Sequence, residues 1–237
     1  MGSKKLLYMP VSEGGYGFKI GSLDPMPAFP EMLNATCLHI PVCFESHIPG
    51  FKINQEISNL EENLKSIQTM TIYVSINGNA SDKYVEKVTN LTKKYKANVF
   101  RRPNTGFQWG GYFDVFTKYE FTYNWFATLE VDCRLNPKWR EIAWPTRHLH
   151  HIGMHPFKTY GLDAHLLKDQ THTRGGFHLC SRPLLQAVRD KFNCFTESKG
   201  CNPLHDGIIL GEIGFCTKIL AAGYPLNPIE NICWSTR

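Results

Sequence analysis

Strand-like and helix-like segments alternate along the chain between residues 36 and 132. Runs of β-branched and apolar residues occupy 36–43, 70–76, 97–100 and 124–129, and segments with helical periodicity lie between them at 53–67, 82–95 and 108–118. Strands that alternate with helices form a mostly parallel sheet covered on both faces, and ligands bind where such strands end. We therefore predict an α/β fold with a mostly parallel central sheet flanked by helices.

Several residues within these segments predict local features. Pro41 lacks a backbone N–H, so we expect the first strand to end or bulge there. Asp82 precedes a helical pattern and is expected to cap that helix. Asn77, Asn104 and Asp132 follow successive strands, which predicts that they meet at the ligand-binding edge of the sheet.

Two acids end the strand-like run at 124–129. Strand side chains alternate, so we expect Glu130 and Asp132 on one face, about 6.5 to 7 Å apart, with Val131 turned away. This spacing suits one carboxylate on a divalent cation and the other on a metal-bound water or a sugar hydroxyl. Oxygen ligands favour Mn²⁺ or Mg²⁺, and such an ion neutralises a leaving diphosphate. The alternative is that both acids are solvated turn residues.

A turn rich in glycine and arginine precedes that strand. Glycine lets the backbone approach a ligand closely, and arginine binds phosphate groups. The turn matches neither the P-loop nor the dinucleotide-binding pattern. We predict that it lines a nucleotide through Arg101, Arg102, Asn104, Thr105, Gly106, Trp109 and Gly110. The alternative is a structural turn with the rings of Phe107 and Trp109 in the core.

The segment from 133 to 172 has little periodicity, which predicts loops and short strands on a second side of the cleft. Trp139 and Trp144 are expected to face a sugar acceptor there. The histidines at 148, 150, 151 and 155 fit no zinc-binding pattern, and we expect them to be exposed to solvent or to support the site from behind. A strand at 173–180, a helix at 182–192 that begins with Pro183, and a helix at 207–222 complete the chain.

Transfer to a hydroxyl group requires a general base on a rigid element near the cleft. Asp206 and Glu212 are the candidates. Asp206 has an alternative role as the N-cap of its helix, whereas Glu212 lies in an apolar stretch, where an unpaired carboxylate is costly. His205 lies at the same helix start as Asp206, and we predict it as a third metal ligand.

Composition excludes several classes of protein. The 237 residues carry a net charge of +5 without a long block of like charges, so a nucleic-acid-binding tail is not indicated and the basic residues are expected on a solvated surface. The eight cysteines are scattered and form no CxxC pair, which indicates reduced thiols rather than a disulfide framework or a structural zinc site. No secretory or membrane-spanning run is visible, so we expect a cytoplasmic protein without a transmembrane segment.

The order of these parts over residues 36 to 228 resembles the GT-A glycosyltransferases, which use nucleotide sugars and have a single α/β sheet. Their short acidic motif at the end of a central strand corresponds to Glu130-Val131-Asp132, with Glu130 in place of the first aspartate. Inverting members carry a Glu-Asp pair ahead of a helix that ends in Ala-Gly-Tyr, and the second acid of the pair is the base. The same spacing, counted back from Ala222-Gly223-Tyr224, leads to Glu212. Here Gly211 stands in place of the first acid. A late histidine that binds the metal corresponds to His205. The turn at 101–111 is similar to one in rhamnan-synthesis-type and small virus-encoded transferases.

This resemblance implies an irregular lead-in at 1–35 and a single catalytic domain at 36–237, with a nucleotide-binding half at 36–132 and an acceptor half at 133–237. It implies an inverting hexosyl- or pentosyltransferase of glycan biosynthesis that moves a sugar from a UDP-sugar to a glycan or glycoconjugate hydroxyl. Pro41 and Asn77 would line the nucleotide with the turn at 101–110, while Asp132, Glu130 and His205 would hold Mn²⁺. The alternatives are a retaining transferase, a nucleotidyltransferase that makes the sugar nucleotide, and a non-catalytic domain that binds nucleotide sugars or carbohydrate.

Overall fold

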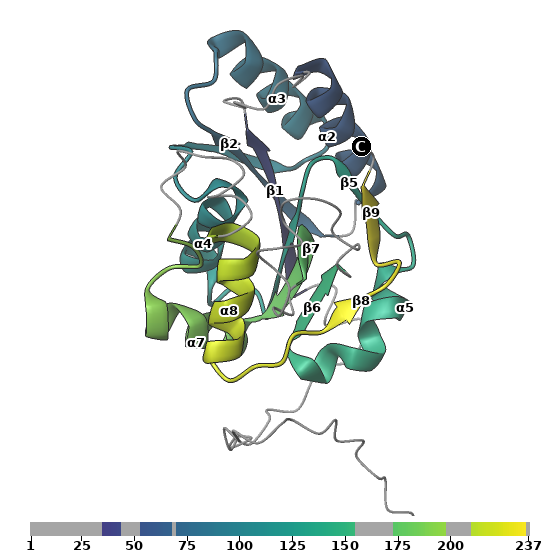
Figure 1. Ribbon diagram of the computed structural model, residues 1–237. Helices are drawn as coiled ribbons and strands as arrows, with labels where there is room; N and C mark the ends of the chain where they lie inside the picture. Colours follow the sequence, from purple (N-terminus) through teal and green to yellow (C-terminus); the bar gives the residue numbers. More distant parts are fainter. Residues whose placement is uncertain (1–34, 44–52, 68–69, 155–172, 198–209, 236–237) are drawn as a thin grey trace, which may run out of the picture.

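The computed structural model describes residues 35–43, 53–67, 70–154, 173–197 and 210–235. These residues form a central seven-stranded sheet, a small two-stranded sheet and helices on both faces of the central sheet (Figure 1). The central sheet contains β1 (Thr36–Cys43), β2 (Thr71–Asn77), β3 (Asn98–Arg102), β4 (Trp125–Leu129), β6 (His151–Met154), β7 (Arg174–Ser181) and β8 (Pro228–Ile229). The second sheet pairs β5 (Cys133–Leu135) with β9 (Cys233–Ser235).

The strands of the central sheet lie in the order β3-β2-β1-β4-β7-β6-β8, and β7 alone runs antiparallel to its neighbours. The predicted α/β fold with a mostly parallel sheet is therefore confirmed. The strand order reverses direction between β1 and β4, because β2 and β3 extend the sheet on one side of β1 and β4 begins the other side. In open α/β sheets, the crevice outside the carboxyl ends of the strands at such a switch point is the usual ligand site.

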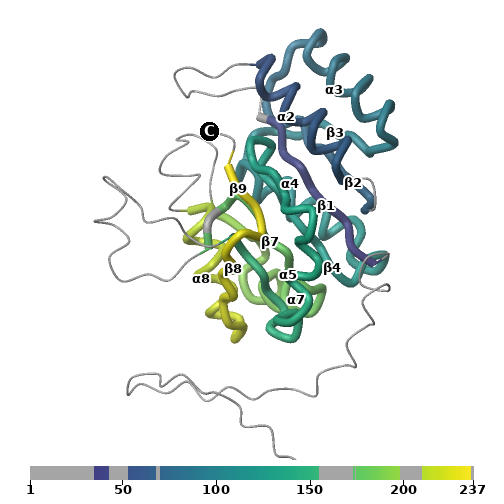
Figure 2. The backbone as a smooth tube through the Cα atoms, turned by 90° about the vertical axis from the view of Figure 1, so that its right-hand side faces the viewer, coloured from purple at the N-terminus to yellow at the C-terminus, as the bar shows by residue number. Residues whose placement is uncertain are grey.

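Two hydrophobic clusters cover the two faces of this sheet. The helices α2 (Ile53–Ser66), α3 (Asp82–Lys94) and α5 (Trp139–Ala143) pack on one face. The helices α4 (Phe107–Tyr119), α7 (Arg182–Phe192) and α8 (Gly214–Ala221) pack on the other. Figures 1 and 2 show α2 and α3 together at one end of the molecule and α7 and α8 together at the other. The 3₁₀ helix η1 (Trp144–Leu149) follows α5 directly.

Burial on both faces explains why the central strands are apolar almost throughout. In β1, Leu38 and Ile40 belong to the cluster under α2 and α3, while Cys37 belongs to the cluster under α4. His39, on the α4 side, is buried and hydrogen-bonds Thr128 and Ser75 on the two neighbouring strands, at 3.1 and 2.8 Å. A polar side chain is thus satisfied inside the sheet–helix interface.

Two local predictions are wrong. β1 continues through Pro41 to Cys43 in unbroken register with β2; its pairing with β4 ends at His39, so Pro41 lies where a missing N–H breaks no ladder on that side. Ser81, not Asp82, caps α3, because its side chain accepts from the backbone N–H of Tyr84.

The helix expected at 207–222 is described from residue 210. A π-helical turn at 210–213 leads there into α8, while 207–209 lie outside the described residues.

Trp139 also departs from its predicted role. Its side chain is 4% exposed and packs within the core against Phe177 of β7. It therefore belongs to the hydrophobic interior and offers no face to a sugar acceptor. Trp144 is partly buried against the same core, and the guanidinium of Arg147 lies 3.6 Å from the centre of its ring.

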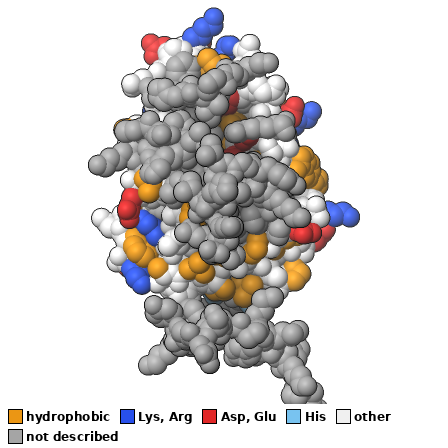
Figure 3. Space-filling view, in the orientation of Figure 1, with side chains coloured by type: hydrophobic (Ala, Val, Ile, Leu, Met, Phe, Trp, Pro, Cys, Tyr) orange, Lys and Arg blue, Asp and Glu red, His pale blue; other side chains and the backbone are white. Residues whose placement is uncertain are grey.

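Charged side chains of both signs are interspersed on the face of the molecule shown in Figure 3. This distribution is consistent with the net charge of +5 being spread over a solvated surface. Among the described residues, no helix is both long and apolar enough to cross a membrane.

Candidate active site

The acidic pair lies in a turn at the switch point of the sheet. β4 ends at Leu129, and the chain then turns so that the N–H of Cys133 donates to the carbonyl of Glu130 at 2.9 Å. The N–H of Glu130 donates to the carbonyl of Gly176 in β7 at 3.0 Å, which ties the turn to the neighbouring strand. Residues 130–132, defined here as the acid turn, therefore occupy the carboxyl end of a central strand.

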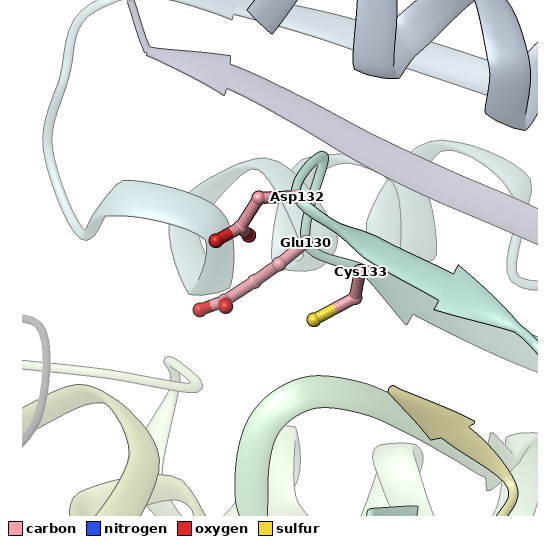
Figure 4. Close-up of side chains that lie close together, drawn as sticks. All are labelled: Glu130, Asp132 and Cys133. Atoms are coloured by element: carbon pink, nitrogen blue, oxygen red, sulfur yellow. The ribbon is translucent and has the colours of Figure 1, made fainter. Parts of the chain in front are cut away.

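The side chains of the acid turn converge with the following cysteine. One ligand atom each from Glu130, Asp132 and Cys133 lies within 4.8 Å of the others, and Figure 4 shows the three side chains projecting to the same side of the turn. The expected spacing of about 6.5 to 7 Å along the chain is that of an extended strand. β4 ends at Leu129, so the two acids lie in a turn where strand geometry does not apply, and their ligand atoms come close together.

This arrangement fits a single divalent cation. Two carboxylates supply the hard oxygen ligands that Mn²⁺ and Mg²⁺ prefer. The adjacent thiol of Cys133 is a softer donor, of the kind that zinc accepts. Its pKa is raised far above the usual range by a hydrogen bond with Cys233, by burial and by the two carboxylates.

The acid turn is also supported from α2. The side-chain amide of Asn63 donates to the carbonyl of Val131 at 3.1 Å, and Arg134 donates to the same carbonyl at 3.3 Å. Val131 separates the two acids, so these hydrogen bonds hold the backbone between them. Neither Asn63 nor Arg134 has a motif that would identify this contact from the sequence.

Two glycines of β7 lie between the acid turn and Glu212. A Cβ atom at Gly176 would come within 2.8 Å of the sulfur of Cys133, and one at Gly175 would come within 2.9 Å of Oε1 of Glu212. The side-chain amide of Gln108 donates to the carbonyl of Gly175 at 2.9 Å and completes this contact. Glu212 therefore lies at the same edge of the sheet as the acid turn, separated from it by two glycines without side chains.

Glu212 lies in the π-helical turn at 210–213, and its side chain is partly exposed. Single π-helical turns are often found at functional sites, where they redirect a side chain. The apolar residues Ile213 and Phe215 are buried and anchor this turn on the core. A carboxylate is thus presented from a rigid element beside the strand that the acid turn contacts.

The glycine-rich turn is filled by the protein's own side chains. A Cβ at Gly106 would lie 2.8 Å from Thr196, one at Gly110 would lie 2.5 Å from the guanidinium of Arg102, and one at Gly111 would lie 2.6 Å from the ring of His39. These glycines therefore allow close packing of the protein's own side chains where a Cβ would lie. The prediction that their backbone also lines a nucleotide stays a prediction.

Trp109 and Arg102 are likewise internal. The indole of Trp109 is 1% exposed and contacts the rings of His178 and Phe215, so it is a core residue rather than part of the nucleotide surface. The guanidinium of Arg102 is directed at α4, where it donates to Asp114 at 2.7 Å and to the carbonyl of Thr105 at 2.8 Å. Its role is to brace the turn.

The other predicted nucleotide residues stay near the sheet edge. Asn77 ends β2, is buried, and accepts from Arg102 at 3.4 Å. Arg101 is exposed, with one weak contact to the carbonyl of Ala80 at 3.4 Å. Asn104 is partly exposed, Thr105 is exposed, and Pro41 is buried near the end of β1.

Two buried histidines on neighbouring strands form a pair that the sequence does not reveal. The backbone N–H of Asn227 donates to Nδ1 of His151 at 3.1 Å, so Nε2 of His151 carries the proton and donates to Nδ1 of His178 at 3.2 Å. Burial lowers the pKa of His151 to about 3. Of the two expected roles of His151, exposure to solvent is therefore wrong, because β6 carries the residue into the sheet; support of the site from behind stays a prediction.

His205 and Asp206 lie outside the described residues, as do the histidines at 155, 165 and 172. Their predicted roles stay predictions. Among the described residues, the acid turn with Cys133 is the group of potential ligands that could hold a metal ion.

Comparison with known proteins relates this chain to others by fold. No protein-family model and no curated protein sequence matches it. A mannosyltransferase from Pyrobaculum calidifontis, solved in complex with GDP-Man and Mn²⁺, has a similar fold, with a TM-score of 0.53 and 11% sequence identity. The similarity covers 86% of this chain but only 58% of the mannosyltransferase, so this chain spans little more than half of that protein's length.

A 4-diphosphocytidyl-2C-methyl-D-erythritol synthase from Anaerococcus prevotii is also similar, with a TM-score of 0.49 and 9% identity over 86% of this chain and 90% of that chain. At these levels of identity, the similarities concern the fold alone. The α/β architecture of this chain is thus similar to that of a glycosyltransferase.

Proposed function

We propose that this protein is a metal-dependent glycosyltransferase that moves a sugar from a nucleoside diphosphate sugar to a hydroxyl group of a glycan or glycoconjugate. The observation that carries the proposal is the convergence of Glu130 and Asp132 at the carboxyl end of β4, where the sheet order reverses. The fold similarity to a mannosyltransferase supports the same class of activity.

Glu130 and Asp132 would hold Mn²⁺ or Mg²⁺ by their carboxylates, with His205 as an additional ligand. When bound, such a cation neutralises the charge that develops on the leaving diphosphate. The hydrogen bonds of the acid turn to Gly176 and Asn63 fix the direction of the two carboxylates before a ligand binds. Preorganisation of this kind reduces the free-energy cost of binding.

The nucleotide would lie along the ends of β1, β2 and β3. Arg101 is the cation best suited to contact a phosphate, because it is exposed and makes a single weak hydrogen bond within the described part of the chain. Pro41, Asn77 and Asn104 would line the base and ribose. A UDP-sugar is the proposed donor.

Glu212 would act as the general base, with Asp206 as the second candidate. Its carboxylate would accept the proton of the acceptor hydroxyl while the hydroxyl oxygen bonds to the anomeric carbon. The bond from that carbon to the diphosphate oxygen breaks, and the nucleoside diphosphate leaves with the electron pair. A single displacement of this type inverts the anomeric centre.

Calorimetry against UDP- and GDP-sugars, with and without Mn²⁺, followed by a donor-hydrolysis assay, tests this function. We expect metal-dependent binding and slow hydrolysis in the native protein and loss of both in Asp132→Asn, while the Glu86→Gln variant, which alters an exposed acid on α3, behaves as the native protein. Full activity in EDTA or in Asp132→Asn would contradict the proposal.

Two further outcomes separate the alternatives. Product analysis by NMR distinguishes inversion from retention at the anomeric carbon. Binding without any turnover against a panel of acceptors would instead indicate a non-catalytic nucleotide-sugar-binding domain.

A further inference from the structure

The face of α2 that packs on the protein contains a stripe of buried polar side chains. Glu56, Asn59 and Asn63 are 5%, 5% and 0% exposed and follow one another at intervals of three and four residues, so they share one side of the helix. Burying amides and carboxylates costs free energy unless they gain specific partners. The hydrogen-bond partners of these three side chains therefore indicate which part of the protein the stripe supports.

Asn59 and Asn63 both lead to the acid turn. Asn63 donates to the carbonyl of Val131 at 3.1 Å. Arg134 donates to the same carbonyl at 3.3 Å and to the side-chain oxygen of Asn59 at 2.9 Å. Glu62, on the next turn of α2, accepts from Nε of Arg134 at 3.1 Å. Helix α2 thus holds the Val131 carbonyl directly through Asn63. It also holds it indirectly, because its side chains bind Arg134, which donates to the same carbonyl.

The Val131 carbonyl belongs to the peptide plane that joins Val131 to Asp132. Fixing this plane fixes the backbone rotation on which the direction of the Asp132 side chain depends. On the other side of the turn, the N–H of Glu130 is fixed by Gly176. The two carboxylates converge only if both ends of the turn are held.

We propose that Asn63 and Arg134 are positioning residues that hold the acid turn in the geometry needed to bind a divalent cation. This inference rests on the proposed function, because it assigns a purpose to the metal site formed by Glu130 and Asp132. Neither residue touches the cation; both act through the Val131 carbonyl. Supporting groups of this kind typically change metal affinity by roughly 10- to 100-fold when removed.

Asn63 offers a way to separate positioning from ordinary stability. Its Oδ1 atom is buried without a hydrogen-bond partner among the described residues. Leucine has a similar shape and no such unsatisfied atom, so Asn63→Leu removes the bond to Val131 and the orphan oxygen together. A purely structural asparagine would give a different pattern, with altered stability and unchanged metal binding.

The test is a titration of the full chain with Mn²⁺ alone, followed by electron paramagnetic resonance of the free ion, beside thermal unfolding of the same samples. We expect Asn63→Leu to bind Mn²⁺ roughly tenfold more weakly than the native protein, with a Tm that is not lowered. Tyr84→Phe is the matched control, because it removes a buried hydrogen bond to Glu56 on the same stripe without contacting the turn. That variant is expected to have a lower Tm and unchanged Mn²⁺ affinity.

A second pair of variants keeps the test valid if Asn63→Leu does not fold. Arg134→Met retains the apolar stem but removes the guanidinium and with it the hydrogen bond to Val131, and we expect a similar loss of Mn²⁺ affinity. Glu62→Gln weakens the ion pair to Arg134 but leaves the contact with Val131, and we expect native affinity. Native Mn²⁺ affinity in both Asn63→Leu and Arg134→Met would overturn the inference. Absence of Mn²⁺ binding by the native protein would instead overturn the proposed function.

Discussion

The guanidinium of Arg102 lies 2.7 Å from the carboxylate of Asp114, so the last residue of β3 is joined to the second turn of α4. The same guanidinium donates to the carbonyl of Thr105 at 2.8 Å and packs where a Cβ of Gly110 would lie. The neighbouring Arg101 alternates to the other face of the strand and is exposed. Two consecutive arginines therefore have different roles, one internal and one available to a ligand.

We expect the two arginines to respond differently to the same substitution. Arg102→Gln should lower the free energy of unfolding by about 2 to 3 kcal/mol, because several charge-assisted hydrogen bonds are lost. Arg101→Gln should leave stability within about 0.5 kcal/mol of the native value and weaken donor binding roughly fivefold, the effect of one exposed ion pair of about 1 kcal/mol.

Urea denaturation and calorimetry with a nucleotide sugar measure these effects. Asp114→Asn is the control for Arg102, since it weakens the same ion pair from the α4 side and should lower stability in the same direction. A stable Arg102→Gln protein with weakened donor binding would reverse the assignment of the two arginines.

The fold could be predicted because its signals are local. The apolar runs at 36–42 and Trp125–Leu129 are buried on both faces, and the segments between them carry helical periodicity. The exceptions have physical causes that depend on neighbours in space. Pro41 is tolerated because β4 no longer pairs beside it, and Ser81 competes with Asp82 for the cap of α3.

The site could be predicted only in part. Glu130 and Asp132 end a buried strand, and that position is visible in the sequence, but their convergence with Cys133 depends on a turn after Leu129. The glycine-rich turn resembles a ligand loop, yet its glycines accommodate side chains of the protein itself, from β1, from β3 and from the segment after α7. Contacts such as those of His39 with Gly111 join residues far apart in the chain and leave no periodic signal.

The buried histidines predict that acid destabilises the fold. Burial, followed by repulsion from Arg102, lowers the pKa of His39 to about 3, and burial lowers that of His151 to about 3. In the unfolded chain both would titrate near 6.5. Between these values the unfolded state binds more protons, so the stability that the two neutral histidines contribute is fully present above about pH 6.5 and is lost as the pH falls toward 3.

The expected slope is about 1.4 kcal/mol per pH unit for each histidine in that window. Urea denaturation between pH 7 and pH 5 measures it, and this range stays above the ordinary pKa of carboxyl groups. His39→Gln should make the slope shallower. A free energy of unfolding that does not change between pH 7 and 5 would show that neither histidine is kept neutral by the fold.

Cys133 predicts competition between metals at the acid turn. Its sulfur lies within 4.8 Å of ligand atoms of Glu130 and Asp132. The raised pKa of Cys133 keeps the thiol protonated without metal, but zinc binding displaces that proton, and the resulting thiolate favours zinc over manganese. Zn²⁺ should therefore displace Mn²⁺ from the native protein, while Cys133→Ser should require much more zinc and keep most of its Mn²⁺ affinity. Titration of zinc into the Mn²⁺-loaded protein, followed by the paramagnetic signal of released Mn²⁺, measures this. Cys194→Ser, at a partly exposed cysteine on another element, is the control.

Glu212 gives the sharpest test of the proposed chemistry. Its Oε1 atom lies 2.9 Å from the position of a Cβ on Gly175, and the next residue, Gly176, is hydrogen-bonded to the acid turn. If this carboxylate takes the acceptor proton, Glu212→Gln should lower kcat by about 10² to 10⁴-fold. Mn²⁺ and donor binding should stay native, because the isosteric amide alters only proton transfer.

The acidic limb of the pH–rate profile, which reports deprotonation of the base, should disappear in that variant. Glu197→Gln is the matched control, since Glu197 is exposed and pairs with Lys218 away from the glycines. Native turnover in Glu212→Gln would exclude this residue as the base and leave Asp206 as the candidate. Loss of donor binding together with kcat would instead indicate that Glu212 contacts the donor, because a base acts on the acceptor alone.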